Sequence, residues 1–130
     1  MKTTTTILSN ARDILSKVKL ATGCYAKRHD NTQCGPHDIN VGSLDLAASI
    51  WLATNGDDEL FNRAWLRVRK HVGWTSFDDK HTNALFCRWL DKHNKEWHLA
   101  RLDEIINGLP LVVTSQKDHA RLVEALKEYA

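Results

Sequence analysis

The sequence predicts an all-α protein, a compact bundle of about six helices with a short hairpin or irregular loop near residues 22–40. Apolar residues recur at helical spacing along most of the 130-residue chain, and only six glycines and two prolines interrupt them. The composition, 42% hydrophobic and 26% charged, is that of an average globular domain and excludes disordered and disulfide-scaffold classes. We therefore expect a single helical domain over residues 1–130.

Two helices are expected in the first half of the chain. Residues 5–20 form the first, because six of their apolar side chains, from Ile7 to Val18, fall within about 120° of a helical wheel. Residues 44–53 form the second, with Ser43 as its cap and Asn55-Gly56 as its stop. This helix is apolar on every side, which predicts that it is the most buried element and that Trp51→Ala is among the most damaging changes.

Four further helices are expected after residue 56. The third follows Asp57 and ends at Gly73, since carboxylates favour the first turn and glycine favours the end of a helix. The fourth runs from residue 79 or 82 to residue 93, and the fifth covers residues 95–107. A capping-box pattern at Ser115 opens the last helix.

The cellular setting is predicted from what the chain lacks and from its cysteines. The N-terminus has no apolar run like that of a signal peptide, and no stretch approaches the roughly 18 apolar residues of a membrane span. Three cysteines are an odd number, which favours a reducing compartment. We expect a cytoplasmic protein with no membrane partner.

One cluster of metal-ligating residue types occurs in the expected loop. Cys24, His29, Cys34 and His37 have the spacing Cys-x4-His-x4-Cys-x2-His, and four such ligands can hold zinc tetrahedrally. The first three match the last three ligands of a retroviral-type zinc knuckle, but Ala21 stands at the position of its first ligand. We expect no metal or other cofactor, with a zinc-stabilised loop as the alternative.

Basic residues are the first candidates for partner binding. Arg63, Arg67 and Lys70 lie within about 60° of one another on the third expected helix, and Arg88 and Lys92 repeat the pattern on the fourth. Such a surface contacts phosphates or an acidic protein face. The net charge of only +2 equally favours solvated helix flanks with no partner.

The turn between the third and fourth helices holds the other candidates. Trp74 and Phe77 would anchor a protein partner if they were exposed, and would cover the end of the core if they were not. Asp78, Asp79 and His81 place carboxylates beside a general base, but two aspartates ahead of a helix are ordinarily caps. The sequence contains no phosphate-binding loop, zinc-protease motif or nucleophile elbow, and we expect no catalytic residues.

The order of several elements resembles a known family. These are the loop at residues 23–27, the small-residue helix at 47–53, and Trp74-x-x-x-Asp78 with Thr82 leading into an amphipathic helix. Over residues 7–94 the chain resembles an uncharacterised family of small helical domains found in actinobacteria and their phages. The resemblance implies a phage or mobile-element setting, in which small proteins bind and block a host machine.

The sequence therefore predicts a non-enzymatic interaction protein that binds and inhibits a host or defence protein complex. Its binding surface would be the third and fourth helices with the Trp74 turn. The alternative is a nucleic-acid-binding module that uses the basic face of the same helices, with or without the zinc loop. A metal-dependent hydrolase around Asp78, Asp79 and His81 ranks last.

Overall fold

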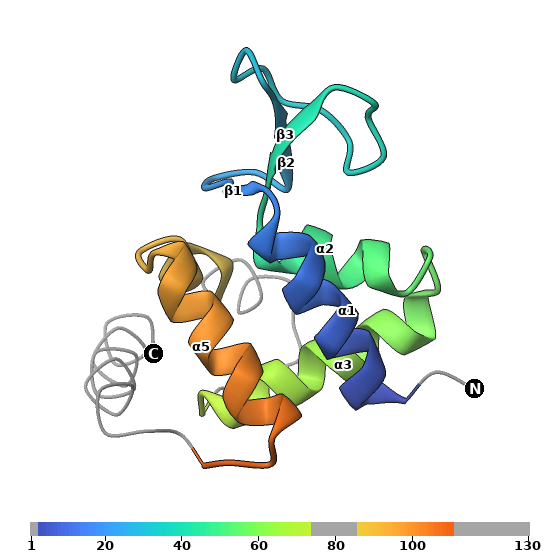
Figure 1. The fold of residues 1–130 in the computed structure, drawn as a ribbon, viewed down its shortest axis with the longest axis vertical. Coiled ribbons are helices and arrows are strands. Elements are labelled where there is room, and N and C mark those ends of the chain that lie inside the picture. The colour runs from blue at the N-terminus through green and yellow to red at the C-terminus, as the bar shows by residue number, and fades with distance from the viewer. Residues whose placement is uncertain (1–2, 74–85, 111–130) are drawn as a thin grey trace.

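Helices make up most of the structure, a computed structural model that describes residues 3–73 and 86–110 (Figure 1). Residues 86–90 are also helical. The named elements, in chain order, are α1 (Thr4–Ser16), β1 (Lys19–Leu20), β2 (Ala26–Arg28), β3 (Val41–Leu44), α2 (Leu46–Ala53), α3 (Asp58–His71) and α5 (Lys95–Ile106). The predicted sixth helix, from Ser115, lies outside the described residues.

The predicted mainly helical character is confirmed, but a small three-stranded sheet makes the fold α+β rather than all-α. The strand order is β1-β3-β2, with β1 parallel and β2 antiparallel to β3. The β2–β3 pair confirms the expected hairpin, although the hairpin continues to Leu44. The prediction that the first helix continues to residue 20 was wrong, because α1 ends at Ser16 and the backbone of residues 19–20 pairs with Ser43 and Leu44. Tertiary pairing here overrides local helical periodicity.

Side-chain caps define where the helices begin. Thr3, Asp45, Asp57 and Asn94 each accept a hydrogen bond from a backbone N–H in the first turn of α1, α2, α3 and α5. The prediction that Ser43 caps α2 was wrong, because Ser43 belongs to β3. Asp45 is the cap, and its Oδ1 accepts from the Ala48 amide at 2.7 Å. Aspartate and serine are about equally good caps, so the sheet decides which residue is used.

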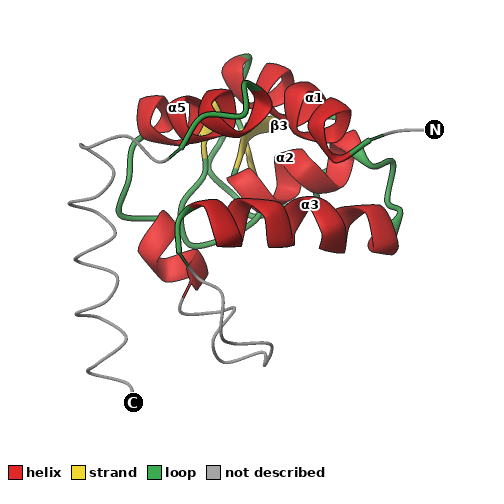
Figure 2. Ribbon diagram, turned by 90° about the horizontal axis from the view of Figure 1, so that it is seen from below, coloured by secondary structure: helices red, strands yellow, loops and turns green. Residues whose placement is uncertain are grey.

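The core lies around α2, which confirms the central position predicted for it. Figure 2 shows α2 between α1 and α3. Leu46, Ala47, Ile50 and Ala53 pack into the main core with α1, α3, α5 and residues 86–90. Ala48 faces a second cluster beneath the sheet, formed with Ala26 and Leu44. None of the helices among the described residues is both long and apolar enough to span a membrane.

Polar contacts join the first and last described helices. Lys95, at the start of α5, donates from Nζ to the carbonyl oxygens of Ser16 (2.9 Å) and Val18 (2.6 Å) at the end of α1. Arg12 of α1 pairs with Asp103 of α5, with 2.8 Å between Nε and Oδ1. The two bonds from Lys95 satisfy backbone carbonyl groups at and just after the end of α1, where helical partners are lacking.

Candidate functional site

An open hollow of about 530 Å³ lies between α2, α3 and the chain around Tyr25 and Pro36. We call it the aromatic groove. Its lining residues are Tyr25, Pro36, Ala47, Ala48, Trp51, Asp58, Phe61 and Asn62. The volume falls in the range of about 300–1,000 Å³ that is typical of ligand pockets.

Local structure explains why the three aromatic rings reach the groove. Tyr25 immediately precedes β2, and because Ala26 points into the core, Tyr25 points outward and is 58% exposed. Trp51 lies on the side of α2 that the core does not cover, and it is half-buried. Its ring lies 3.2 Å from the position that a Cβ at Gly56 would take, and Gly56 adopts φ +79°. This glycine therefore permits both the turn after α2 and the position of the ring.

The groove has an apolar floor and a polar rim. Ala47 and Ala48 are small, which leaves room between the larger rings. Asp58 and Asn62, one turn apart on α3, supply a carboxylate and an amide at the edge. Such a surface can take an apolar side chain and a neighbouring cation or N–H donor.

The structure separates the groove from the predicted basic surface. Arg63, Arg67 and Lys70 are exposed on α3, on the side opposite its buried residues. Arg63 pairs with Glu59 one turn earlier. Arg88 and Lys92 are also exposed. Trp74, Phe77, Asp78, Asp79 and His81 lie outside the described residues.

The four candidate zinc ligands do not converge. In residues 3–73 and 86–110, no group of three or more His, Cys, Asp or Glu side chains is placed to hold a metal ion. The His37 ring instead contacts Trp51 edge-on, with 4.7 Å between the ring centroids. The Cys24 thiol donates to the Ala26 carbonyl at 3.5 Å. The described geometry thus offers no support for the zinc alternative.

We expect the purified protein to contain no stoichiometric zinc and to keep its melting temperature in the presence of EDTA. The reason is that a structural zinc site stabilises its fold strongly, so that a chelator lowers the stability of a true zinc protein. Elemental analysis and thermal denaturation measure both quantities. One zinc per chain that is lost on Cys24→Ser would restore the zinc alternative.

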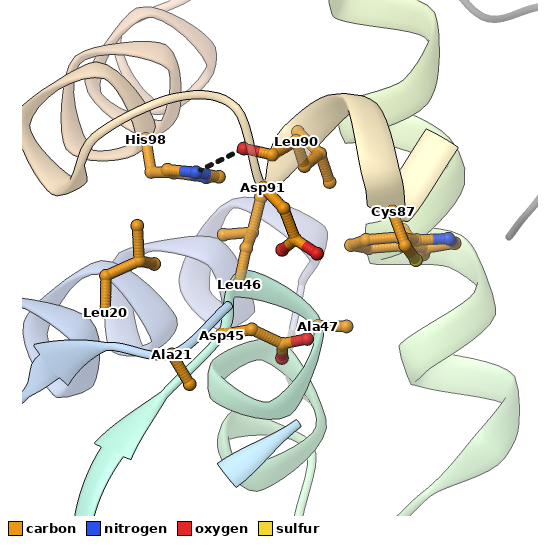
Figure 3. A pocket seen from close by; sticks show the side chains of 10 residues that line it. Leu20, Ala21, Asp45, Leu46, Ala47, Cys87, Leu90, Asp91 and His98 are labelled. Atoms are coloured by element: carbon orange, nitrogen blue, oxygen red, sulfur yellow. Dashed lines mark hydrogen bonds between the residues drawn. The ribbon is translucent and has the colours of Figure 1, made fainter. Parts of the chain in front are cut away.

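A second, enclosed cluster of ionisable groups lies between the start of α2, residues 86–91 and α5 (Figure 3). Asp45, Cys87, Asp91 and His98 line a cavity of about 10 Å³. Burial, and to a lesser extent the charge of Asp91, raises the pKa of Asp45 to about 7. Burial also raises the pKa of the Cys87 thiol to about 11 and lowers the pKa of His98 to about 4.

The hydrogen bonds of this cluster support the backbone around it. Its cavity has the volume of a single water molecule, about 10–15 Å³, and admits no substrate. A raised thiol pKa disfavours the thiolate, which is the reactive form of cysteine. Two of the side chains have structural roles, since Asp91 accepts from the Gly23 amide at 3.0 Å and His98 Nε2 donates to the Leu90 carbonyl at 3.1 Å.

Sequence reasoning missed the aromatic groove because its residues come from separate segments. Tyr25 belonged to the irregular loop, while Trp51 was expected to be buried with the rest of its helix. One signal was present in the sequence: α2 is apolar on every side, and in a small domain even a central helix can leave part of such a surface uncovered.

Comparison of the chain with family models, with curated proteins and with solved structures gives no match. The resemblance to small helical domains of actinobacteria and their phages therefore stays a prediction.

Proposed function

We propose that this chain is a non-enzymatic interaction protein and that its aromatic groove receives an apolar segment of a protein partner. The observation that carries this proposal is the open hollow of about 530 Å³ lined by Tyr25, Trp51 and Phe61. Exposed aromatic side chains are the commonest anchors of protein interfaces, because they bury a large area at a small entropic loss. The enclosed cluster at Asp45 and Cys87 offers no comparable access.

The rim of the groove defines the chemistry of the partner. Asp58 and Asn62 place acceptor oxygens beside the apolar floor, so a segment with a Lys or Arg next to an aliphatic or aromatic residue fits best. The resemblance to phage helical domains extends the proposal to a host or defence protein complex as the source of that segment.

We expect Tyr25→Ala and Trp51→Ala to abolish capture of the partner. Loss of a central aromatic anchor weakens an interface by about 2 kcal/mol or more, which is roughly 30-fold in affinity. Chemical crosslinking in host lysate, followed by mass spectrometry, identifies the partner. Titration calorimetry with that purified partner then measures the affinity of the parent and the two variants.

The matched control is Ile39→Ala, because Ile39 is 95% exposed and does not line the groove. This variant should bind like the parent. Circular dichroism should show that Tyr25→Ala is folded, since removal of an exposed side chain changes stability by only about 0.5 kcal/mol. Equal affinity of the parent and both groove variants would refute the groove as the binding site.

The alternative function, nucleic-acid binding, is favoured by the exposed cations of α3. Within the described part of the chain neither Arg67 nor Lys70 forms an ion pair, and residues 60–73 contain no acid. Arg88 and Lys92 add two further exposed charges. A basic face of this kind binds a phosphate backbone without a pocket.

For that alternative we expect the triple variant Arg63→Glu/Arg67→Glu/Lys70→Glu to lose nucleic-acid binding. Its helical circular dichroism spectrum should stay intact. Phosphate neutralisation by three residues gives a log-log salt slope of roughly −2 to −3. Fluorescence anisotropy with a labelled oligonucleotide measures this slope. The groove is the binding site if the partner is still captured after nuclease treatment and by the triple variant, but is no longer captured by Tyr25→Ala.

A further inference from the structure

The outer face of the sheet carries a row of polar side chains at one end of the molecule. Lys19 of β1 and Lys27 of β2 both lie opposite Ser43 of β3, so the three side chains share one face. The next row, Leu20, Leu44 and Ala26, faces the opposite way and includes two fully buried residues. Figure 1 shows β2 and β3 projecting from one end of the helical part of the molecule.

A β-bulge brings a histidine to the same face. The pairing steps from Lys27–Ser43 to Arg28–Val41, which leaves Gly42 as the extra residue of β3. His29 packs directly over this glycine, because a Cβ at position 42 would lie 2.7 Å from His29 Nδ1. The imidazole of His29 therefore lies beside Ser43 on the sheet. Any residue larger than glycine at position 42 would displace this ring.

The sheet and the loops beside it surround a hollow of about 140 Å³. None of the residues that line this hollow is acidic. The lining residues include Lys19, Lys27, Arg28, His29, Gly42 and Ser43. Arg28 is held by Asp38 through Nε (3.1 Å) and Nη2 (3.0 Å), so its charge is largely compensated. Lys19 and Lys27 have no ion pair with any described residue.

We propose that this hollow, the sheet-face site, binds a phosphate group. Strands lie about 4.8 Å apart, so the two lysine Cα atoms are roughly 10 Å apart, and both ammonium groups can reach one anion above Ser43. Two cations, a hydroxyl and an imidazole match a dianionic oxyanion with several acceptor oxygens. The hollow is smaller than the roughly 300 Å³ of ordinary ligand pockets, which favours a single charged group.

The phosphate has two possible sources, a small phosphate compound or the backbone of a nucleic acid. The test titrates the ¹⁵N-labelled protein with inorganic phosphate at constant ionic strength and follows the amide signals of Lys19, Lys27, His29 and Ser43. We expect saturable shifts with phosphate and none with acetate. Lys27→Gln should weaken phosphate binding roughly tenfold, the expected effect of one lost charge-assisted hydrogen bond.

The control is Lys17→Gln, which removes an equal charge from the end of α1, where Lys17 pairs with Asp13. It should bind phosphate like the parent. A labelled single-stranded oligonucleotide then separates the sources. Binding with a log-log salt slope of about −1.4, lost in Lys19→Gln/Lys27→Gln, identifies a nucleic-acid backbone, since about 0.7 counterions are released per phosphate. Phosphate binding without oligonucleotide binding identifies a small ligand.

The proposal is overturned if neither probe binds, or if Lys17→Gln and Lys27→Gln weaken phosphate binding equally. The dispersion of the amide spectrum shows that each variant is folded. None of the residues varied here lines the aromatic groove, so the outcome is independent of the proposed protein partner.

Discussion

Replacing Phe86 with alanine should lower the free energy of unfolding by about 3–5 kcal/mol, the usual effect of deleting a buried aromatic ring. Phe86 is fully buried. Its ring centroid lies 5.2 Å from that of Trp65 on α3 and 6.1 Å from that of Trp89. The cavity left by the substitution would therefore weaken the contact between α3 and residues 86–90. Because domains are stable by only about 5–15 kcal/mol, this is a large part of the total.

Urea denaturation followed by tryptophan fluorescence and by far-ultraviolet circular dichroism measures this loss. Leu66→Ala is the control, because Leu66 is the neighbour of Trp65 on α3 and is 38% exposed. It should lower the free energy of unfolding by less than about 1 kcal/mol. A loss below 1 kcal/mol for Phe86→Ala would show that Phe86 does not connect the two helices.

The second large effect concerns the pH dependence of stability at the enclosed cluster. Asp45 has a pKa of about 7 in the folded protein, above its ordinary value, so its contribution to stability is complete below about pH 4 and is lost as the pH rises to 7. His98 has a folded pKa of about 4, below its ordinary value, so its contribution is lost as the pH falls from about 6.5 to 4. Between pH 4 and 6.5 the two slopes therefore oppose each other.

We expect each single variant to reveal the slope of the remaining group. Relative to the parent, Asp45→Asn should gain stability as the pH rises from 4 to 6.5, and His98→Gln should gain stability as the pH falls over the same range. Each difference approaches at most about 1.4 kcal/mol per pH unit, the value for one proton. Urea denaturation at half-unit pH intervals measures both.

The substitutions are chosen to keep the local hydrogen bonds. Asparagine still caps α2 through its side-chain oxygen, and glutamine keeps an N–H donor for the Leu90 carbonyl. If both variants follow the parent at every pH, then burial does not shift the two pKa values as described.

Local signals in the sequence predict the helices well. The ends of α3 and α5 follow from capping residues and from glycines, and α5 was expected at residues 95–107 and observed at Lys95–Ile106. Strand β1 escaped prediction because it has only two residues and directly follows the amphipathic pattern of the first helix. Its existence depends on pairing with residues 43–44, and no local pattern encodes a partner more than 20 residues away.

The candidate sites were harder to predict than the helices, because most of them depend on contacts between segments that are distant in the sequence. Helical spacing correctly predicted that Arg63, Arg67 and Lys70 share a face, because this depends only on neighbours along one helix. The sheet-face site depends on strand register, on a bulge at Gly42 and on the resulting position of His29. Cross-strand geometry of this kind appears only when the pairing is known.

The bonds from Lys95 to the carbonyls of Ser16 and Val18 connect groups 79 and 77 residues apart. On the ribosome α1 emerges first, yet the acceptors at its end meet their donor only after α5 has been synthesised. These two bonds can therefore form only late in synthesis, after most of the described chain has been made. A nascent chain stalled before residue 95 should consequently be a good substrate for chaperones and proteases.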